Sequence, residues 1–256
     1  MSLQHFFLEE QVLADEDAAA FTLRLTADDV KHARVLRLAA GERIAVVDAA
    51  QDYFVCEVVS FDGALPRVRI AQRADAGPAA APQVVLVQGL AKGDKMDTVV
   101  RHATELGVGA FVPLVCERSV VRLDAKKARS RTERWRAIAK SAAMQSGQRR
   151  IPEVAEPAPL DAACVRLAAA QAVLVCWEEA PQTARLPEAL AGVAADGGPV
   201  AVVVGPEGGL TNREVDALLS CNARARLVTL GPSILRTETA GIVAPALVLY
   251  ELGRLG

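Results

Sequence analysis

Residues 200–214 read VAVVVGPEGGLTNRE and indicate an α/β protein. The apolar residues at the start are typical of a strand buried on both faces of a parallel sheet. Three glycines follow within Gly205–Gly209, and Thr211–Glu214 is a capping box that opens a helix. Glycines let a ligand approach the main chain, and open α/β sheets bind ligands at the carboxyl ends of their strands. An ordinary strand–helix turn is the alternative, but it needs only one glycine.

A second loop of this kind is LGPSILRTETA at Leu230–Ala240, directly before a final apolar helix. Thr237 or Thr239 is a candidate N-cap for that helix, and Glu238 would favour its dipole. Arg236 has no comparable structural explanation on an otherwise apolar run. Because the two loops follow neighbouring strands, we expect them to form one pocket.

Short apolar runs alternate with helical stretches through residues 83–256. The expected strands are Val84–Gln88, Phe111–Val115, Val173–Trp177, Val200–Val204 and Arg226–Leu230. The expected helices are Met96–Leu106, Thr132–Gln145, Leu186–Ala195, one starting at Thr211, and Thr239–Leu252. This alternation predicts an α/β domain with a parallel sheet.

The first 73 residues have a different, β-rich pattern. The expected strands are Glu42–Ala49, Tyr53–Phe61 and Pro66–Gln72, after a helix at Thr26–Leu38 capped by Thr26. Three close strands without intervening helices predict a small antiparallel barrel or sheet. The stretch ADAGPAAAP at residues 74–82 holds small residues and two prolines, so we place the linker there.

Composition excludes several classes of protein. Apolar residues make up 52% of the 256, which excludes disorder, and no apolar run approaches the roughly 20 residues of a membrane span. The first residues lack the charged and apolar regions of a secretion signal. Five cysteines without a C-x-x-C pair and three dispersed histidines predict no zinc site and a reduced, cytoplasmic setting.

Charge is unevenly distributed, although the net charge is only −2. Residues 118–150 hold eleven Lys and Arg against two acidic residues, a local net of +9, and the rest of the chain carries −11. This segment predicts contact with a polyanion such as RNA, and a solvated helix face is the alternative.

Common cofactor and catalytic motifs are missing. No G-x-G-x-x-G follows the first strand of the α/β region, and GLAKGDK at residues 89–95 lacks the spacing of a phosphate loop. His32 and His102 stand alone and are expected to be structural or surface residues.

Several motifs together resemble the RsmE family, SPOUT-class methyltransferases that modify N3 of a uridine in 16S ribosomal RNA. The matching motifs are GPEGGL followed by T-x-x-E, LG-P-x-ILRTETA before the last helix, GLAKGDKMDTVVRHATELGV at Gly89–Val108, SVVRL at Ser119–Leu123, W-x-x-I-A-K and Q-S-x-x-R-x-x-P within Arg134–Pro152, and Val35-Leu36-Arg37. The resemblance covers nearly the whole chain.

The resemblance implies a PUA-like β-barrel RNA-binding domain on residues 1–73, the linker 74–82, and a SPOUT-type knotted parallel-sheet methyltransferase domain on residues 83–256. It also implies S-adenosyl-L-methionine as cofactor, 16S ribosomal RNA or the small ribosomal subunit as substrate, and a homodimer without metal or membrane. The family typically has an arginine beside the early aromatic pair, whereas His5 stands there in this chain. The change weakens an RNA contact at that position.

The resemblance assigns the cofactor to residues after three strands. These are Cys176, Trp177, Glu178, Gly205, Pro206, Glu207, Gly208, Gly209, Leu230, Gly231, Ile234, Leu235, Thr237 and Ala240. Methylating uracil N3 requires loss of its proton before attack on the sulfonium methyl. Arg236 is the candidate for stabilising negative charge on the uracil oxygens, and Glu207 or Glu238, with a raised pKa, is the candidate base. Hydroxide with an orienting arginine is the alternative.

The same resemblance and the basic segment assign RNA contacts to His5, Arg34, Arg37, Lys92, Lys95, Arg118, Arg122, Lys140, Gln145, Ser146, Arg149 and Arg150. Two other functions stay open. One is a SPOUT methyltransferase with another RNA target, such as a tRNA ribose, and the other is a non-catalytic ribosomal RNA-binding assembly factor.

Overall fold

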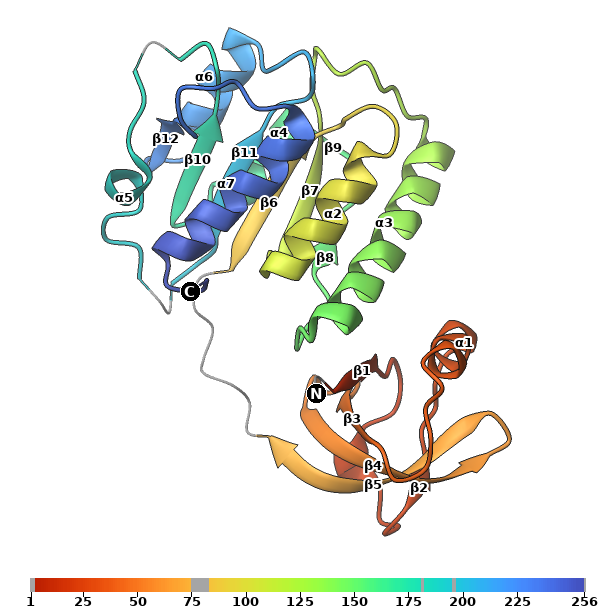
Figure 1. Ribbon diagram of the computed structural model, residues 1–256. Helices are drawn as coiled ribbons and strands as arrows, with labels where there is room; N and C mark the ends of the chain where they lie inside the picture. The colour runs from red at the N-terminus through yellow and green to blue at the C-terminus, as the bar shows by residue number, and fades with distance from the viewer. Residues whose placement is uncertain (1–2, 75–82, 181, 195–196, 256) are drawn as a thin grey trace. The chain divides into compact units, whose positions relative to one another are not determined.

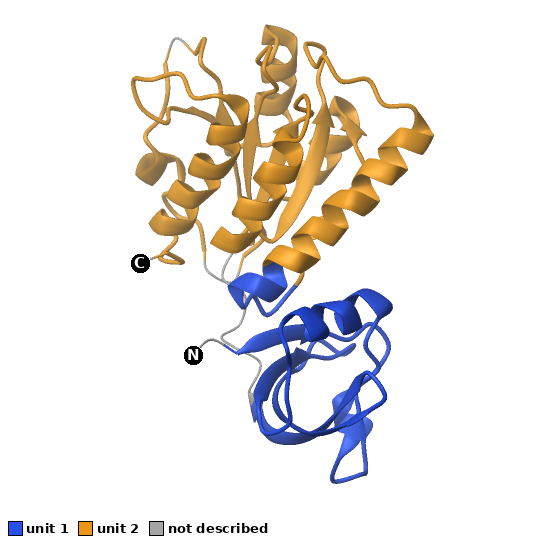
Figure 2. Cartoon of the chain, turned by 45° about the vertical axis from the view of Figure 1, so that its right-hand side comes forward, with its two compact units in different colours: residues 1–79, 143–150 blue, residues 80–142, 151–256 orange. Residues whose placement is uncertain are grey.

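The computed structural model describes residues 3–74, 83–180, 182–194 and 197–255. They form two compact units, coloured separately in Figure 2. The first unit takes in the chain up to residue 74 together with residues 143–150, and the second holds the remaining described residues. The prediction placed residues 143–150 in the second domain, 83–256, whereas in the structure they belong to the first unit. The predicted linker 74–82 lies outside the described residues, apart from Ala74 at the end of a strand.

A five-stranded sheet in the order β1-β3-β4-β5-β2 builds the first unit (Figure 1). Its elements are β1 (Gln4–Phe7), the 3-10 helix η1 (Leu13–Asp15), β2 (Phe21–Thr22), α1 (Ala27–Val35), β3 (Arg43–Val47), β4 (Tyr53–Asp62) and β5 (Leu65–Ala74). The three predicted strands, β3 to β5, pair antiparallel, but β1 pairs parallel with β3, so the sheet is not wholly antiparallel. The short strands β1 and β2 give too few residues for an alternating pattern.

Helix α1 begins where it was predicted and ends earlier. The Thr26 hydroxyl accepts a hydrogen bond from the Asp29 amide at 3.2 Å, which confirms Thr26 as the N-cap. The prediction extended the helix to Leu38, but Arg37 has a left-handed φ of 56°, and this conformation ends the helical path.

The core of the first unit is completed by residues distant in sequence. Phe6 and Phe54 from the sheet are fully buried, and Ala143 and Met144 pack in the same cluster. The latter two belong to the end of α3 (Ala125–Ser146), whose earlier residues belong to the second unit. The amphipathic pattern of one helix therefore serves two cores.

The second unit is built on a seven-stranded parallel sheet in the order β12-β10-β11-β6-β7-β8, with β9 also paired to β7. The strands are β6 (Val84–Gly89), β7 (Ala110–Val115), β8 (Glu153–Val154), β9 (Ala158–Pro159), β10 (Ala172–Cys176), β11 (Val200–Val204) and β12 (Ala225–Val228). All five predicted strands are confirmed, although β12 ends two residues early. This parallel sheet, following a small β domain, agrees with the predicted α/β fold class.

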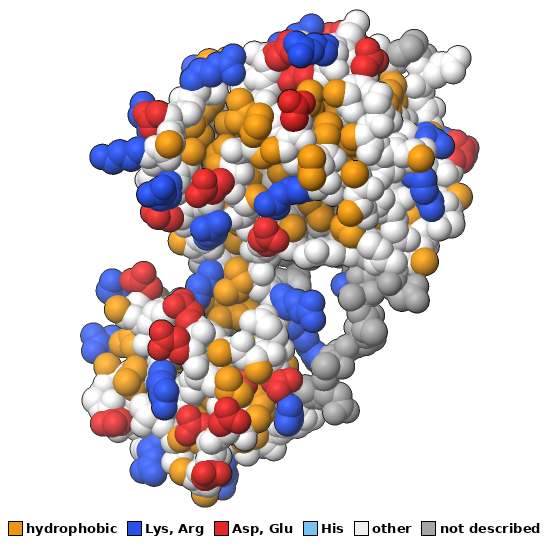
Figure 3. Space-filling view, turned by 180° about the vertical axis from the view of Figure 1, so that it is seen from behind, with side chains coloured by type: hydrophobic (Ala, Val, Ile, Leu, Met, Phe, Trp, Pro, Cys, Tyr) orange, Lys and Arg blue, Asp and Glu red, His pale blue; other side chains and the backbone are white. Residues whose placement is uncertain are grey.

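Helices cover both faces of this sheet, as Figure 1 shows. They are α2 (Lys95–Leu106), α3, α4 (Leu160–Leu167), α5 (Leu186–Ala189), α6 (Asn212–Ser220) and α7 (Thr237–Glu251). Val202 and Val204 of β11 pack in a core with residues of α2, α3, α5 and α7, whereas Ala201 and Val203 pack with residues of α4 and α6. Burial on both faces explains the uninterrupted apolar runs. On the side seen in Figure 3, charges of both signs are mixed among hydrophobic side chains.

Three helices differ from their predicted bounds. Helix α3 begins at Ala125 rather than Thr132, because Asp124 Oδ1 accepts a hydrogen bond from the Lys127 amide at 2.8 Å and caps two further turns of mainly basic residues. Helix α5 ends at Ala189, well before the predicted end at Ala195, a residue outside the described part. Helix α4 was not predicted, because its eight residues are too few for a clear helical period. No helix of the described residues is long and apolar enough to cross a membrane.

The carboxyl-terminal helix α7 returns from the edge of the sheet to its centre. The chain leaves the edge strand β12, passes the glycine loop after β11, and enters α7, which packs against α2 and β6. The helix begins at Thr237, two residues before the predicted start, and its N-cap is Arg236 rather than a threonine. This return brings Leu230–Ala240 beside Gly205–Gly209.

Candidate functional site

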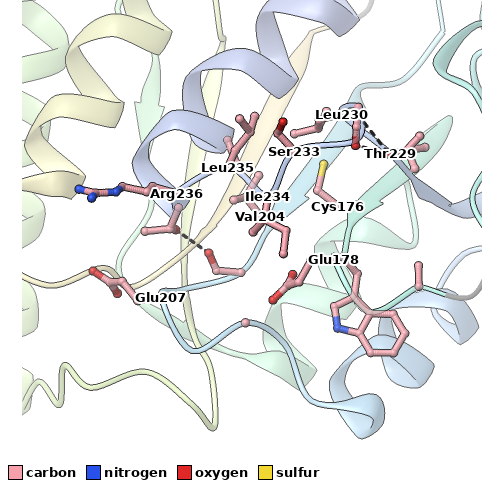
Figure 4. Close-up of a pocket in the computed structure, with 18 of the residues that line it drawn as sticks. Cys176, Glu178, Val204, Glu207, Thr229, Leu230, Ser233, Ile234, Leu235 and Arg236 are labelled. Atoms are coloured by element: carbon pink, nitrogen blue, oxygen red, sulfur yellow. Dashed lines mark hydrogen bonds between the residues drawn. The ribbon is translucent and has the colours of Figure 1, made fainter.

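A pocket of about 580 Å³ lies at the carboxyl ends of β10, β11 and β12 (Figure 4). It is lined by Lys95, Cys176, Trp177, Glu178, Ala180, Thr183, Val204, Gly205, Pro206, Glu207, Gly209, Val228, Thr229, Leu230, Gly231, Pro232, Ser233, Ile234, Leu235, Arg236, Thr237 and Ala240. Every residue predicted to hold the cofactor is among them except Gly208. The sequence therefore located the pocket from two loops and one strand end.

Gly208 faces away from the pocket. A Cβ atom at this position would stand 2.9 Å from the Arg118 carbonyl oxygen. The Arg118 guanidinium in turn donates to the carbonyl oxygens of Gly208 and Leu210 at 3.3 and 3.4 Å. Arg118, predicted as an RNA contact, thus holds the glycine loop from the side opposite the pocket.

Gly209 is the glycine that shapes the pocket wall. Its φ of +69° lies in the left-handed region, and an added Cβ would come within 2.5 Å of Glu178 Oε1. A side chain here would meet backbone strain, and it would force the flexible Glu178 side chain to move. The loop therefore requires glycine at this position for a reason that Gly208 does not share.

A buried hydroxyl joins the two loops. Thr237 Oγ1 donates to the Gly205 carbonyl oxygen at 2.6 Å and accepts from Gln88 Nε2 at 2.9 Å. The Thr237 side chain is thus a structural link between β6, the glycine loop and the start of α7, and both of its hydrogen-bonding directions are used. This role was not visible in the sequence, because the three partners are far apart along the chain.

One end of the pocket is charged. Lys95 Nζ lies 2.9 Å from Glu207 Oε1 and 3.1 Å from Glu238 Oε2, and the Lys92 amide donates to Glu207 Oε1 at 3.0 Å. Lys95 was predicted as an RNA contact, but it lines the pocket as part of this cluster. The rest of the lining combines apolar or sulfur-bearing side chains such as Cys176 and Leu230 with the Glu178 carboxylate and the hydroxyls of Thr229 and Ser233 (Figure 4).

The pKa directions follow from these contacts. The two carboxylates raise the pKa of Lys95. Burial raises the pKa of Glu207, but Lys95 and the backbone amides outweigh it, so the pKa is lowered overall. The Glu238 pKa is also lowered, first by its own backbone amide and then by Lys95. Both directions are opposite to the raised pKa that was predicted for a catalytic base.

Arg236 lies at this charged end. Figure 4 shows it on the same side of the pocket as Glu207, away from Cys176 and Leu230. The side chain is exposed, and its guanidinium has no hydrogen bond or ion pair with any other described residue. It is therefore available to a ligand.

The predicted RNA contacts are spread over both units. His5 is buried, its Nδ1 donates to the Leu3 carbonyl at 3.0 Å, and its Nε2 accepts from the Tyr53 hydroxyl at 3.3 Å. Burial lowers the His5 pKa more than the Leu3 hydrogen bond raises it. His5 is thus a buried structural residue beside Tyr53, and the Arg149 guanidinium lies 4.6 Å over the Tyr53 ring centre.

The remaining predicted RNA contacts differ in exposure and bonding. Arg122 donates to the carbonyl oxygens of Cys116 and Glu117, so it also orders a loop. Lys140 is half-buried. The exposed members are Arg34, Arg37, Lys92, Gln145, Ser146, Arg149 and Arg150.

The comparisons with known proteins agree with this geometry. A family model for the RNA methyltransferase domain matches residues 79–249. The ribosomal RNA small subunit methyltransferase E of Bacillus subtilis is 33% identical to this chain, over 97% of both proteins. The chain belongs to the ribosomal RNA small subunit methyltransferase E family. A family member from Mycobacterium bovis is 36% identical over 83% of this chain and 79% of its own.

Solved structures place the family fold over the whole chain. One hypothetical protein is 31% identical and matches with a TM-score of 0.83 over 97% of this chain and 98% of its own. A ribosomal RNA small subunit methyltransferase E from Neisseria gonorrhoeae, bound to S-adenosyl methionine, matches with a TM-score of 0.78 at 27% identity, over 97% and 98% of the two chains. The two-part architecture is thus a property of this methyltransferase family.

Proposed function

We propose that this protein methylates N3 of a uridine in the small-subunit ribosomal RNA, using S-adenosyl-L-methionine. The observation that carries the proposal is the pocket between the two glycine loops, in a chain of the ribosomal RNA small subunit methyltransferase E family. The Neisseria relative is described as bound to this cofactor. Ribosomal RNA as the substrate also favours a cytoplasmic protein.

The residues of the pocket fit S-adenosyl-L-methionine. The volume of about 580 Å³ is in the range of small-molecule sites. Val204, Leu230 and Ile234 offer apolar walls, and the glycine loops offer backbone polar groups to a nucleoside. Trp177 Nε1 is buried and has no hydrogen-bond partner among the described residues, so a ligand is a candidate for its acceptor.

When bound, the cofactor supplies a methyl group on a positively charged sulfur. The chain's own residues would align the cofactor and the uracil base, exclude water, and accept the proton that leaves N3. Pocket walls from three strand ends would hold the reactants, and Arg236 is exposed at the charged end of the pocket. A cation there stabilises the negative charge that uracil gains when N3 loses its proton.

Contacts with RNA are proposed for exposed basic residues of both units. Arg149 and Arg150 belong to the first unit, and helix α3 carries further basic residues. Such contacts recognise phosphate and RNA shape. The predicted PUA-like RNA-binding role of the first unit is part of this proposal.

A homodimer is proposed on the basis of the solvent side of α7. Leu247 and Tyr250 on the solvent side of this helix are 37% and 63% exposed, and the side that packs on the sheet is also apolar. A continuous apolar helix face is typical of a surface that a second subunit covers. Sedimentation of the wild type and of Leu247→Asp would test it, with a monomeric wild type as the contrary result.

The deciding experiment is nucleoside mass spectrometry of ribosomal RNA from cells with and without the gene. We expect 3-methyluridine in small-subunit RNA only when the gene is present. A methylated ribose in tRNA would favour the alternative RNA target. Unchanged nucleosides, together with no cofactor binding in calorimetry, would favour the non-catalytic assembly factor.

A further inference from the structure

Three charged side chains line the same end of the pocket: Lys95, Glu207 and Arg236. They come from the start of α2, the glycine loop and the N-cap of α7. The first two are held 2.9 Å apart, and Glu238 at 3.1 Å fixes Lys95 from the other side without lining the pocket. The cluster is partly exposed, since the side chains of Lys95 and Glu207 are 29% and 30% accessible.

Each of the three presents a defined hydrogen-bonding character. Lys95 and Arg236 are donors only, and Glu207 as a carboxylate is an acceptor. Two partners of Glu207, Lys95 Nζ and the Lys92 amide, contact Oε1, and the backbone amide of Glu207 also acts on the carboxylate. Oε2 is the carboxylate oxygen that Lys95 and the Lys92 amide leave to a ligand.

The Watson–Crick edge of uracil has the complementary order: an oxygen acceptor, the N3–H donor and a second oxygen acceptor. We infer, on the basis of the proposed function, that Lys95, Glu207 and Arg236 recognise this edge, with Glu207 opposite N3–H and the two cations opposite the oxygens. Cytosine offers a lone pair at N3, which the Glu207 carboxylate would repel. The cluster therefore selects uracil as well as activating it.

The same arrangement supports the proton transfer. In the reaction the N3–H bond breaks, its proton passes to Glu207, and the electron pair left on N3 forms the N3–CH₃ bond while the S–CH₃ pair stays on sulfur. A carboxylate with a lowered pKa is a weak base on its own. Two cations beside the uracil oxygens lower the pKa of N3–H, by about 1–3 units for charges within contact distance. The difference between the pKa of N3–H and the pKa of Glu207 becomes smaller as a result.

Other charges near Lys95 are already accounted for. Glu207 and Glu238 are the carboxylates that raise the pKa of its ammonium group, and Arg236 contributes to lowering the pKa of Glu238. On the α3 side, Arg134 is held by Asp97 at 2.6 Å.

The test measures single-turnover methylation against pH with saturating cofactor. The substrates are small-subunit ribosomal RNA and assembled subunits from cells that lack the gene. Lys95→Gln should reduce the rate about 100-fold, as for the loss of one donor to a developing anion. It should also move the rise of the rate toward higher pH by about 1 unit or more. Lys95→Arg, which keeps the charge, should retain most of the rate. Arg101→Gln, on the exposed side of the same helix, is the control.

Melting and cofactor calorimetry separate this role from a merely structural one. If Lys95 serves only to bridge Glu207 and Glu238, Lys95→Gln should melt earlier and bind cofactor more weakly, with an unchanged pH profile. That result would overturn the inference, and so would a stable variant with a normal rate. Failure of the proposed function is a different outcome, because the wild type itself would then form no 3-methyluridine in either substrate.

Discussion

Replacing Thr237 by Val removes the hydroxyl that joins the two loops and keeps the shape of the side chain. The Gly205 carbonyl oxygen loses a partner, and Gln88 Nε2 keeps, among the described residues, only its 3.4 Å hydrogen bond to the Gly89 carbonyl oxygen. An unsatisfied buried polar group costs about 1–3 kcal/mol. Since Gln88 is 1% exposed and Gly205 is half-buried, we expect the free energy of unfolding to fall by about 2–4 kcal/mol.

The loss should appear in two measurements. At about 2–4 °C per kcal/mol for a unit of this size, the Tm should fall by about 4–16 °C. Loosening of both loops should also weaken cofactor binding roughly tenfold in calorimetry, which corresponds to about 1.4 kcal/mol. Thr239→Val is the matched control, because Thr239 is exposed on the same helix and should change the free energy of unfolding by less than about 0.5 kcal/mol.

A double-mutant cycle completes the test. Gln88→Leu alone should also destabilise the protein, but Gln88→Leu with Thr237→Val should cost less than the sum, because both partners of one hydrogen bond are then apolar. A Tm for Thr237→Val equal to that of Thr239→Val would refute the reasoning. It would mean that the hydroxyl link contributes nothing to holding the loops.

Gly209→Val should abolish cofactor binding in calorimetry through strain and collision with Glu178, and wild-type affinity in a folded variant would contradict this. Arg149→Gln with Arg150→Gln should reduce the slope of log affinity for RNA against log salt by about 0.7–0.9 per lost phosphate contact, with unchanged cofactor affinity. Because burial lowers the His5 pKa, protonation opposes folding, so the free energy of unfolding should fall as the pH drops below about 6.5. His5→Gln should flatten that dependence in urea titrations, and an identical slope would exclude His5 as its source.

The sequence predicted the parts of this protein whose physical signal is local. Val200–Val204 is buried on both faces, and such a strand leaves an unbroken apolar run. The glycine loops were predicted as the pocket because the carboxyl ends of parallel strands meet at one edge. The RsmE resemblance added the residue assignments that local pattern alone did not supply.

What the sequence missed depends on contacts between distant segments. Lys95 looked like one more basic residue for RNA, and only its two carboxylate partners, from the glycine loop and the first turn of α7, reveal its place in the pocket. Gly208 and Gly209 are adjacent and identical in sequence, yet their Cβ directions face Arg118 and Glu178 respectively. The parallel pairing of β1 was equally invisible, because four residues carry no information on a partner strand some forty residues away.

The shared helix α3 has a consequence for how the protein is made. A nascent chain that has grown only through β5 lacks Ala143 and Met144, so the apolar side of its first sheet stays incompletely covered. At about 5–20 residues per second, the missing residues follow roughly 4–14 s later. During that interval the apolar surface that Ala143 and Met144 cover in the folded protein stays exposed. The core of the first unit is completed only after the end of helix α3 has been synthesised, together with part of the second unit.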